Sequence, residues 1–464
     1  MQTTGLAGSV ASAKFHPQFS ANSVDNKTRS EMHETRPAKI TSPITSLEGG
    51  HLRTIPVALI VGAIGIGATL VLSGMDMKRF MFIYLTSFCF VLSISLGCLF
   101  FVTIMHLTRA GWSVTVRRIA ELWAMCAFPL FILFLPILAT VVVGSDIIYS
   151  WNVGGWSIHA HDAATEAAKS AAAAADIGER PPLEQLKYAF LNKWFFTARI
   201  VAYFLIWSGM AWFFLKNSLK QDETGDKNLT SSMQAFSAPL MILFAVTIVF
   251  ASFDLEMSLS ALWFSTMFPV YFFSGAFLSG LCTIMLTGFW LQRTGRVTDE
   301  ITIEHYHDLG KLMQGFIIFW GYIAFSQFLL IWYANIPEET FWYNLRINQP
   351  GWKTLSLILL IGHLFIPFFL LMGRRLRRNR KLLAFSAVFI LFMHWVDHYW
   401  VIMPQMSPET NLYTLSGGGI LIDVACSVGV IAIYVALFCL IARNRPLVPL
   451  KDPRLGEALN HEVH

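Results

Sequence analysis

The sequence predicts an all-α integral membrane protein with ten transmembrane helices, and three observations support this. The 464 residues are 55% hydrophobic and only 14% charged, with a mean hydropathy of +0.55, whereas a soluble chain carries about 25% charged residues. Ten apolar segments have the length of roughly 20 residues that a helix needs to cross a bilayer. The alternating apolar pattern of a membrane β-barrel is absent, so helices are the spanning elements.

The ten spans follow one another through most of the chain. The first contains Gly62, Gly65 and Gly67, small residues that allow two helices to approach closely. The eighth contains Pro367, which predicts a kink just before it. In chain order the predicted spans are residues 55–73, 81–105, 119–143, 195–215, 235–252, 266–290, 312–333, 354–372, 382–403 and 419–441.

The loops set the expected domain organisation and orientation. Residues 1–50 form a polar N-terminal tail, residues 51–445 form the membrane domain, and residues 446–464 form a C-terminal tail. Residues 144–194 form a long periplasmic loop, whose Ala-rich stretch 161–176 predicts a short helix. Most of the 34 Lys and Arg residues lie in the two tails and the even-numbered loops. The positive-inside rule therefore predicts that both termini are cytoplasmic, with the basic run 374–381 as a topology and headgroup anchor rather than a nucleic-acid patch.

Cysteine usage excludes several cofactors. The six Cys residues are spread singly, and no C-x-x-C or C-x-x-C-H motif occurs. A covalently attached haem, a Cys-ligated iron–sulfur cluster and a zinc ribbon therefore have no sequence support, and no metal site is predicted. Most of these cysteines sit in apolar runs, where packing is their expected role.

The predicted ninth span carries an unusual density of ionisable residues. His394, Asp397 and His398 occupy positions i, i+3 and i+4, which places them on one helical face, in the outer half of the span. Ionisable groups at membrane depth cost several kcal/mol, so each is a functional candidate.

Other polar residues extend this set. Asp423 lies near the start of the tenth span, and His363 lies near the middle of the eighth. Three residues of the seventh span would carry a polar string inward, and two residues before it would form a cytoplasmic point of proton uptake. These are Tyr322, Ser326 and Gln327, then His307 and Asp308.

Such a string has three functional interpretations and a structural one. It could conduct protons, bind the headgroup of a quinol, or ligate a b-type haem through paired histidines, the interpretation with least support. Alternatively, Asp397 and His394 satisfy each other between helices. Asp423 would then be interfacial, and Glu304 and Asp308 would be first-turn caps of a short helix.

Several motifs in the second half of the chain resemble a known family. The sequence HDLGKL at 307–312 leads to FWGYIAFSQ at 319–327 and IWYANIPEET at 331–340, and HWVDHYW follows at 394–400. Together with SFDLEMSL at 252–259 and WFST at 263–266, these resemble the ActF membrane subunits of bacterial alternative complex III, within the NrfD-like family of polysulfide-reductase-type enzymes. The resemblance covers roughly residues 50–445.

The resemblance implies both a fold and a role. It implies two four-helix bundles plus a further helix pair, in the bacterial inner membrane. It implies a non-catalytic subunit without its own redox centre, in a complex that oxidises menaquinol or a similar quinol and passes electrons to a cytochrome c or a terminal oxidase. Quinone, as a possible ligand, and a proton path are the roles implied for this chain.

The resemblance also implies partners. A paralogous NrfD-like quinol-binding subunit, an iron–sulfur protein and c-type cytochrome subunits would carry the haems and clusters, and no nucleic acid is involved. One departure from the family pattern is Ser260-Ala261-Leu262, where related chains often carry an acidic residue and Pro-His. This departure weakens the case for an acid/base role of that external segment.

Two other functions remain open from the residues. A secondary transporter would have a similar number of helices with buried charges, and should break its helices at corresponding midplane positions. A purely structural anchor would use the same helices to dock partner subunits.

Overall fold

The computed structural model describes residue 47 and residues 53–74, 76–152, 187, 189–349, 351–406 and 417–462, all within the unit Lys39–His464. Ten helices in these residues are long and apolar enough to cross a membrane, and the bridge between Leu47 and Arg443 is isolated. The predicted all-α membrane fold is confirmed. The predicted helix 161–176, most of the loop 144–194 and nearly all of the tail 1–50 lie outside the described residues.

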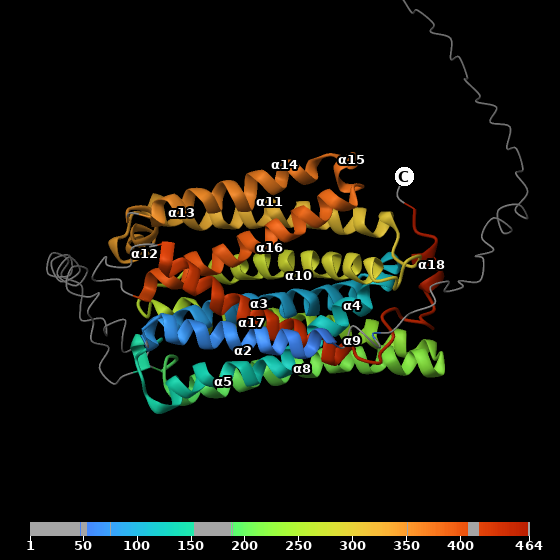
Figure 1. Cartoon of the computed structure of the whole chain (residues 1–464), viewed down its shortest axis with the longest axis horizontal. Helices are drawn as coiled ribbons and strands as arrows, with labels where there is room; N and C mark the ends of the chain where they lie inside the picture. Colours follow the sequence, from blue (N-terminus) through green and yellow to red (C-terminus); the bar gives the residue numbers. More distant parts are fainter. Residues whose placement is uncertain are drawn as a thin grey trace, which may run out of the picture. The chain divides into compact units, whose positions relative to one another are not determined.

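Each predicted span corresponds to one helix or to consecutive helical segments (Figure 1). The spans are α2 (Thr54–Leu72), α3 (Met77–Leu107), α4 (Val114–Met125) with α5 (Ala127–Val143), α8 (Lys193–Thr224), α9 (Lys227–Leu255), α10 (Phe268–Arg293), α11 (Ile303–Ala334), α13 (Trp352–Leu359) with the π-helical turn η5 (Leu360–Phe365) and α14 (Ile366–Met372), α16 (Arg380–Ile402) and α17 (Gly417–Ala442). Shorter helices are α12 (Pro337–Ile347), α15 (Arg374–Arg377) and α18 (Leu455–Leu459).

Some helices continue well beyond the apolar run that predicted them. Helix α11 begins at Ile303 because Thr302 and His305 form a reciprocal capping box at its start. Glu304 and Asp308 were expected to cap a separate short helix, and that expectation is wrong, since Thr302 is the cap and the helix runs unbroken to Ala334.

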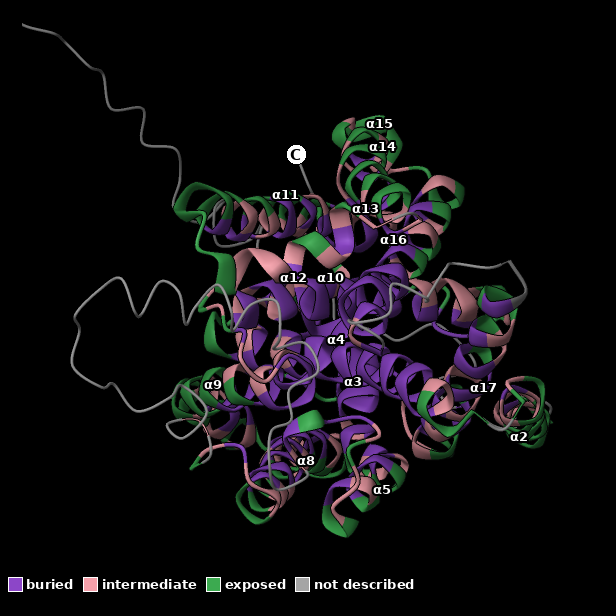
Figure 2. Cartoon of the chain, turned by 90° about the vertical axis from the view of Figure 1, so that its left-hand side faces the viewer, coloured by how far each residue is buried: buried purple, intermediate pink, exposed green. Residues whose placement is uncertain are grey.

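The helices form two bundles and a pair. The first bundle contains α3, α4 with α5, α8 and α9, and the second contains α10, α11, α13 with α14, and α16, while α2 packs on α17. The central helices are α3 and α10, whose apolar windows are 89% and 83% buried, against 11% for α2. Figure 2 shows the same gradient from a buried centre to exposed outer helices.

Glycines allow the backbones to touch at two crossings. A Cβ on Gly280 of α10 would lie 2.7 Å from the carbonyl carbon of Gly97 on α3, and a Cβ on Gly65 of α2 would lie 2.6 Å from the carbonyl oxygen of Ala425 on α17. Gly62 also faces α17, whereas a Cβ on Gly67 would meet open space. The expected close approach therefore involves Gly62 and Gly65 but not Gly67.

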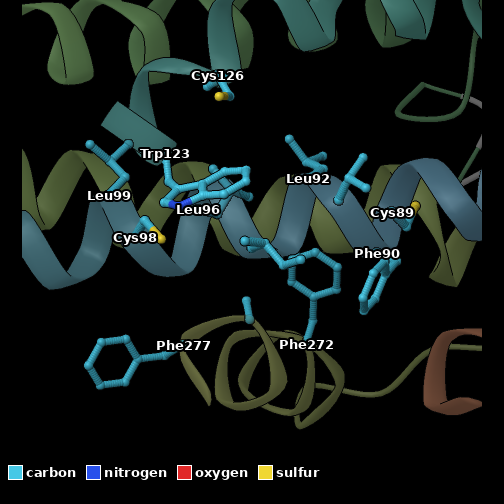
Figure 3. Packing of buried hydrophobic residues seen from close by; sticks show 14 of the residues in the cluster. Cys89, Phe90, Leu92, Leu96, Cys98, Leu99, Trp123, Cys126, Phe272 and Phe277 are labelled. Atoms are coloured by element: carbon cyan, nitrogen blue, oxygen red, sulfur yellow. The ribbon is translucent and has the colours of Figure 1, made fainter. Parts of the chain in front are cut away.

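Apolar side chains fill the space around the α3–α10 crossing. Phe272 and Phe277 of α10 lie beside Leu96 of α3, and Trp123 of α4 packs nearby (Figure 3). All six cysteines are buried and unlinked by disulfides. Their role in packing is as expected.

One end of the described structure, here called the basic end, carries α15 and α18 (Figure 1), and α12 lies at the opposite end. The C-terminal tail crosses the basic end. Asp452 of the tail contacts Arg117 of α4 at 2.5 Å, and the backbone N–H of Leu450 donates to Asp222 of α8 at 2.7 Å. The tail therefore closes the basic end of the first bundle through buried ion pairs.

Candidate functional site

A group of buried titratable side chains lies in the second bundle, in the half away from the basic end. We call it the imidazole cluster, and each of its members is at most 4% exposed. Three of its five side chains come from α16, one from η5, and one from the residue that ends α9. Its members are His394, Asp397, His398, His363 and Glu256.

The two α16 histidines reach different partners. Nδ1 of His398 lies 2.7 Å from Oε1 of Glu256, which is the cluster's outermost carboxylate. Nε2 of His394 lies 2.9 Å from Oγ of Ser93 on α3. The hydroxyl of Ser93 donates its proton to the carbonyl of Phe90 at 2.7 Å, so it accepts the Nε2–H of His394. Nδ1 of His394 is then its acceptor nitrogen.

His363 is fully buried at the middle of its span, and neither of its ring nitrogens has a hydrogen-bond partner among the described residues. It sits in the π-helical turn η5, just before Pro367. Such turns are rare and frequent at functional sites. The ring of His363 stands edge-on to Trp320 at 4.0 Å and nearly parallel to His394 at 6.2 Å between centroids.

Asp397 is bonded to two aromatic donors from neighbouring helices. The hydroxyl of Tyr271 on α10 donates to Oδ1, and the indole N–H of Trp320 on α11 donates to Oδ2 at 3.1 Å. The structural alternative that paired Asp397 with His394 is therefore wrong. Their side chains leave α16 in different directions, toward α10 and α11 in one case and toward α3 in the other.

The cluster can hold and move protons. The rings of His394 and His398 are 4.6 Å apart, and Glu256 continues the line toward the end of α9. Nδ1 of His394 and Nε2 of His398 have no hydrogen-bond partner among the described residues. A buried unpaired nitrogen costs about 1–3 kcal/mol, so the arrangement is poor for stability alone. These nitrogens can gain or lose a proton without breaking a bond already made.

The outer end of α16 is held by a buried cation. Arg346 of α12 is fully buried, and its guanidinium donates to the carbonyls of Trp400 at 3.0 Å, Val401 at 2.6 Å and Trp342 at 2.6 Å. A cation at a helix C-terminus is favoured by the helix dipole. Arg346 thereby fixes the segment that carries His398.

Asp423 belongs to a different contact. Its carboxylate accepts two hydrogen bonds of 3.2 Å from Arg79 of α3 and one of 2.8 Å from the hydroxyl of Tyr399. This ion pair ties α17 to the central helix α3. The structure therefore places Asp423 in a structural ion pair and not in the imidazole cluster.

The seventh-span residues do not extend the cluster inward. The side chain of Tyr322 is 64% exposed on the outer surface of α11, and Ser326 is half-buried one turn further on. Gln327 is buried, but it accepts from Ser265 and donates to Tyr343, both at 3.3 Å. The prediction that these three residues lead toward His307 is wrong, because they lie in the half of α11 farther from it.

His307 and Asp308 form a separate group at the basic end. Asp308 contacts Lys311 at 2.5 Å and His461 of the C-terminal tail at 2.6 Å. His307 is buried, and its nitrogens have no hydrogen-bond partner among the described residues. Between His307 and Trp320 lie about 20 Å of α11.

The buried side chains along that stretch are mainly apolar, including Met313 and Ile317. On α16, Ser386 is buried about 12 Å before His394. The structure thus supplies a continuous set of titratable groups in one half of the bundle and an apolar stretch in the other.

Four residues of the site could not be singled out beforehand. Ser93, Tyr271 and Trp320 are ordinary members of apolar spans, with no signal in the sequence. Glu256 carried a signal, since it lies with Asp254 in an apolar segment without basic residues. Asp254 itself binds Arg199 at 2.6 Å, which leaves Glu256 as the carboxylate that faces the cluster.

The chain matches no protein-family model and no curated protein. Among the described residues, no group of three or more His, Cys, Asp or Glu side chains could hold a metal ion. The site is therefore interpreted from its own geometry.

Proposed function

We propose that this chain is a membrane subunit of a quinol-oxidising electron-transfer complex of the alternative complex III type, without a redox centre of its own, and that the imidazole cluster carries protons through one half of the membrane. The motif resemblance supports the type of complex. The observation that carries the role in proton transfer is the line from Glu256 through His398 to His394, buried at 4% exposure or less.

Close packing favours proton transfer over binding of a quinol headgroup at the cluster. A Cβ on Gly275 of α10 would lie 2.7 Å from Cε1 of His394, and a Cβ on Gly362 would lie 2.7 Å from Met393. Helix backbones thus lie directly against the cluster, which does not fit an additional quinol ring. Protons pass between packed side chains without such space. Quinone binding by this chain is the alternative role.

The setting follows from the same proposal. The chain is a multi-pass protein of the bacterial inner membrane, its basic end is cytoplasmic by the positive-inside rule, and the imidazole cluster lies toward the periplasm. Its partners are the paralogous quinol-binding subunit, an iron–sulfur protein and c-type cytochromes. A proton released by quinol oxidation on the periplasmic side would meet Glu256 first.

Affinity purification in mild detergent tests the type of complex. Multihaem cytochromes, an iron–sulfur protein and a second NrfD-like subunit should co-purify with a tagged chain, with haem bands in the optical spectrum. A colourless preparation without partners would contradict the proposal.

A pair of matched carboxylate variants tests the role in proton transfer. Glu256→Gln removes the carboxylate that faces His398, and the rate of proton transfer coupled to quinol oxidation should fall by about 10²-fold or more. Asp423→Asn changes an equally buried carboxylate in the same half of the membrane, and the assembled complex should keep its rate. Equal rates in the wild type and in Glu256→Gln would refute the role.

A secondary transporter is the principal rival, and broken helices at the midplane would favour it. Breaks occur at Cys126, between α4 and α5, and at η5. They affect the second helix of one bundle and the third of the other, so they do not correspond. A purely structural anchor predicts that changes in the cluster alter only assembly.

A further inference from the structure

A pocket of about 810 Å³ opens at the basic end, apart from the imidazole cluster. Three segments distant in sequence form its wall, namely the start of α11, the turn that contains α15, and the end of the C-terminal tail. The lining residues are Thr302, Ile303, Glu304, Arg374, Arg375, Arg378, Leu459, Asn460, His461 and Glu462.

The turn between α14 and α16 gives the pocket its positive charge. Arg378 is held in place by Glu304, with Nη1 3.0 Å from Oε2, so this pair is largely neutral. The side chains of Arg374 and Arg375 are exposed beside it. A guanidinium is planar and presents paired N–H donors that match two oxygens of a phosphate.

Apolar neighbours place the pocket at the membrane surface. Met372, the last residue of α14, is 55% exposed, and Leu376 within α15 is 39% exposed. These apolar side chains alternate with the arginines over a single turn, where the span of α14 ends and that of α16 begins. Acyl chains could cover Met372 and Leu376 while the arginines reach the headgroup layer. Free phosphate would have no use for that apolar border.

We propose that this pocket binds the phosphate headgroup of an acidic phospholipid, with Arg374 and Arg375 as its ligands. The site adjoins the contact between the tail and α11, because His461 both lines the pocket and bonds to Asp308 at 2.6 Å. A bound phosphate therefore competes with Asp308 for the His461 imidazole. The proposal does not depend on the electron-transfer role proposed above.

Lipid titration of the purified full-length protein, with its co-purifying subunits, tests the site. Phosphatidylglycerol is added to the protein in phosphatidylcholine nanodiscs, and binding is followed by native mass spectrometry. The variant Arg374→Gln/Arg375→Gln should bind phosphatidylglycerol about 30-fold more weakly, from the usual contribution of two arginines at an anionic surface. The matched control Arg443→Gln/Arg445→Gln removes the same charge from the end of α17, outside the pocket, and should stay within twofold of the wild type.

Other arms separate the possible outcomes. Inorganic phosphate at the same concentration should not protect the protein against thermal unfolding, and equal protection by phosphate would overturn the lipid as ligand. Equal losses in the two double variants would overturn the pocket, because any basic residue would then serve. If the Gln variant does not fold, Arg374→Lys/Arg375→Lys keeps the charge without the planar fork. It should bind several-fold more weakly than the wild type, and unchanged binding would overturn the two arginines as phosphate ligands.

Discussion

The ion pair between Arg79 and Asp423 should respond very differently to the loss of each partner. The side chain of Arg79 is 20% exposed, whereas that of Asp423 is fully buried. Arg79→Met leaves a buried carboxylate without its cation, a change that costs about 3–5 kcal/mol. Asp423→Asn leaves a guanidinium that reaches solvent and still has an amide oxygen as acceptor. We expect a loss of only about 1–2 kcal/mol, close to that of one hydrogen bond to a charged group.

The double variant Arg79→Met/Asp423→Leu completes the cycle. Replacing both members of a buried pair by apolar residues is often neutral, so its stability should return to within ~1 kcal/mol of the wild type. Unfolding by sodium dodecyl sulfate in mixed micelles measures the three differences. Equal losses in the two single variants, or a double loss equal to their sum, would refute the argument that the buried carboxylate decides the energy.

Three further predictions concern other parts of the structure. Gly280→Ala should destabilise the protein by about 1–3 kcal/mol, because its methyl group meets the backbone of α3. Gly209→Ala on α8, where nothing lies within 4 Å, should stabilise it by up to ~1 kcal/mol, and thermal unfolding that ranks the two in the opposite order would contradict the packing. Burial lowers the pKa of Lys187 to about 8, so acetylation followed by mass spectrometry should show its reactivity levelling off above pH 8–9, whereas an ordinary lysine continues to gain reactivity up to a pKa near ~10.4. A curve that rises like an ordinary lysine's would contradict the burial. Arg346→Gln should speed hydrogen exchange in residues 396–402 by loosening the end of α16, and Lys353→Gln on α13 should not.

The spans could be predicted because the bilayer fixes their length and composition. All ten apolar runs became helices, since no other structure satisfies the backbone in a membrane. Helix α12 was missed, because it is amphipathic and too short to span. Its signal was present in Pro337 at the first turn, followed by Glu338 and Glu339. The arrangement into two bundles followed only from the family resemblance, because helical periodicity does not say which helices pack together.

The candidate site could be predicted in part. Helical spacing placed His394, Asp397 and His398 on one face, but a face about 60° wide is enough to direct them to three different neighbours. The partners come from α3, α9, α10 and α11, and their choice depends on how those helices cross. For the same reason Asp423 could not be separated from the site by sequence, since its partner Arg79 lies 344 positions earlier.

The contacts of the C-terminal tail bear on how the protein is made. Arg118 of α4 is fully buried and depends on Asp222 at 2.7 Å and on the carbonyl of Pro446 at 3.2 Å, while Asp308 receives His461 from the end of the tail. These partners leave the ribosome after all ten spans have been inserted. The basic end is therefore completed last during biosynthesis, and a fusion partner for purification belongs on the N-terminus, where it cannot compete with that final step.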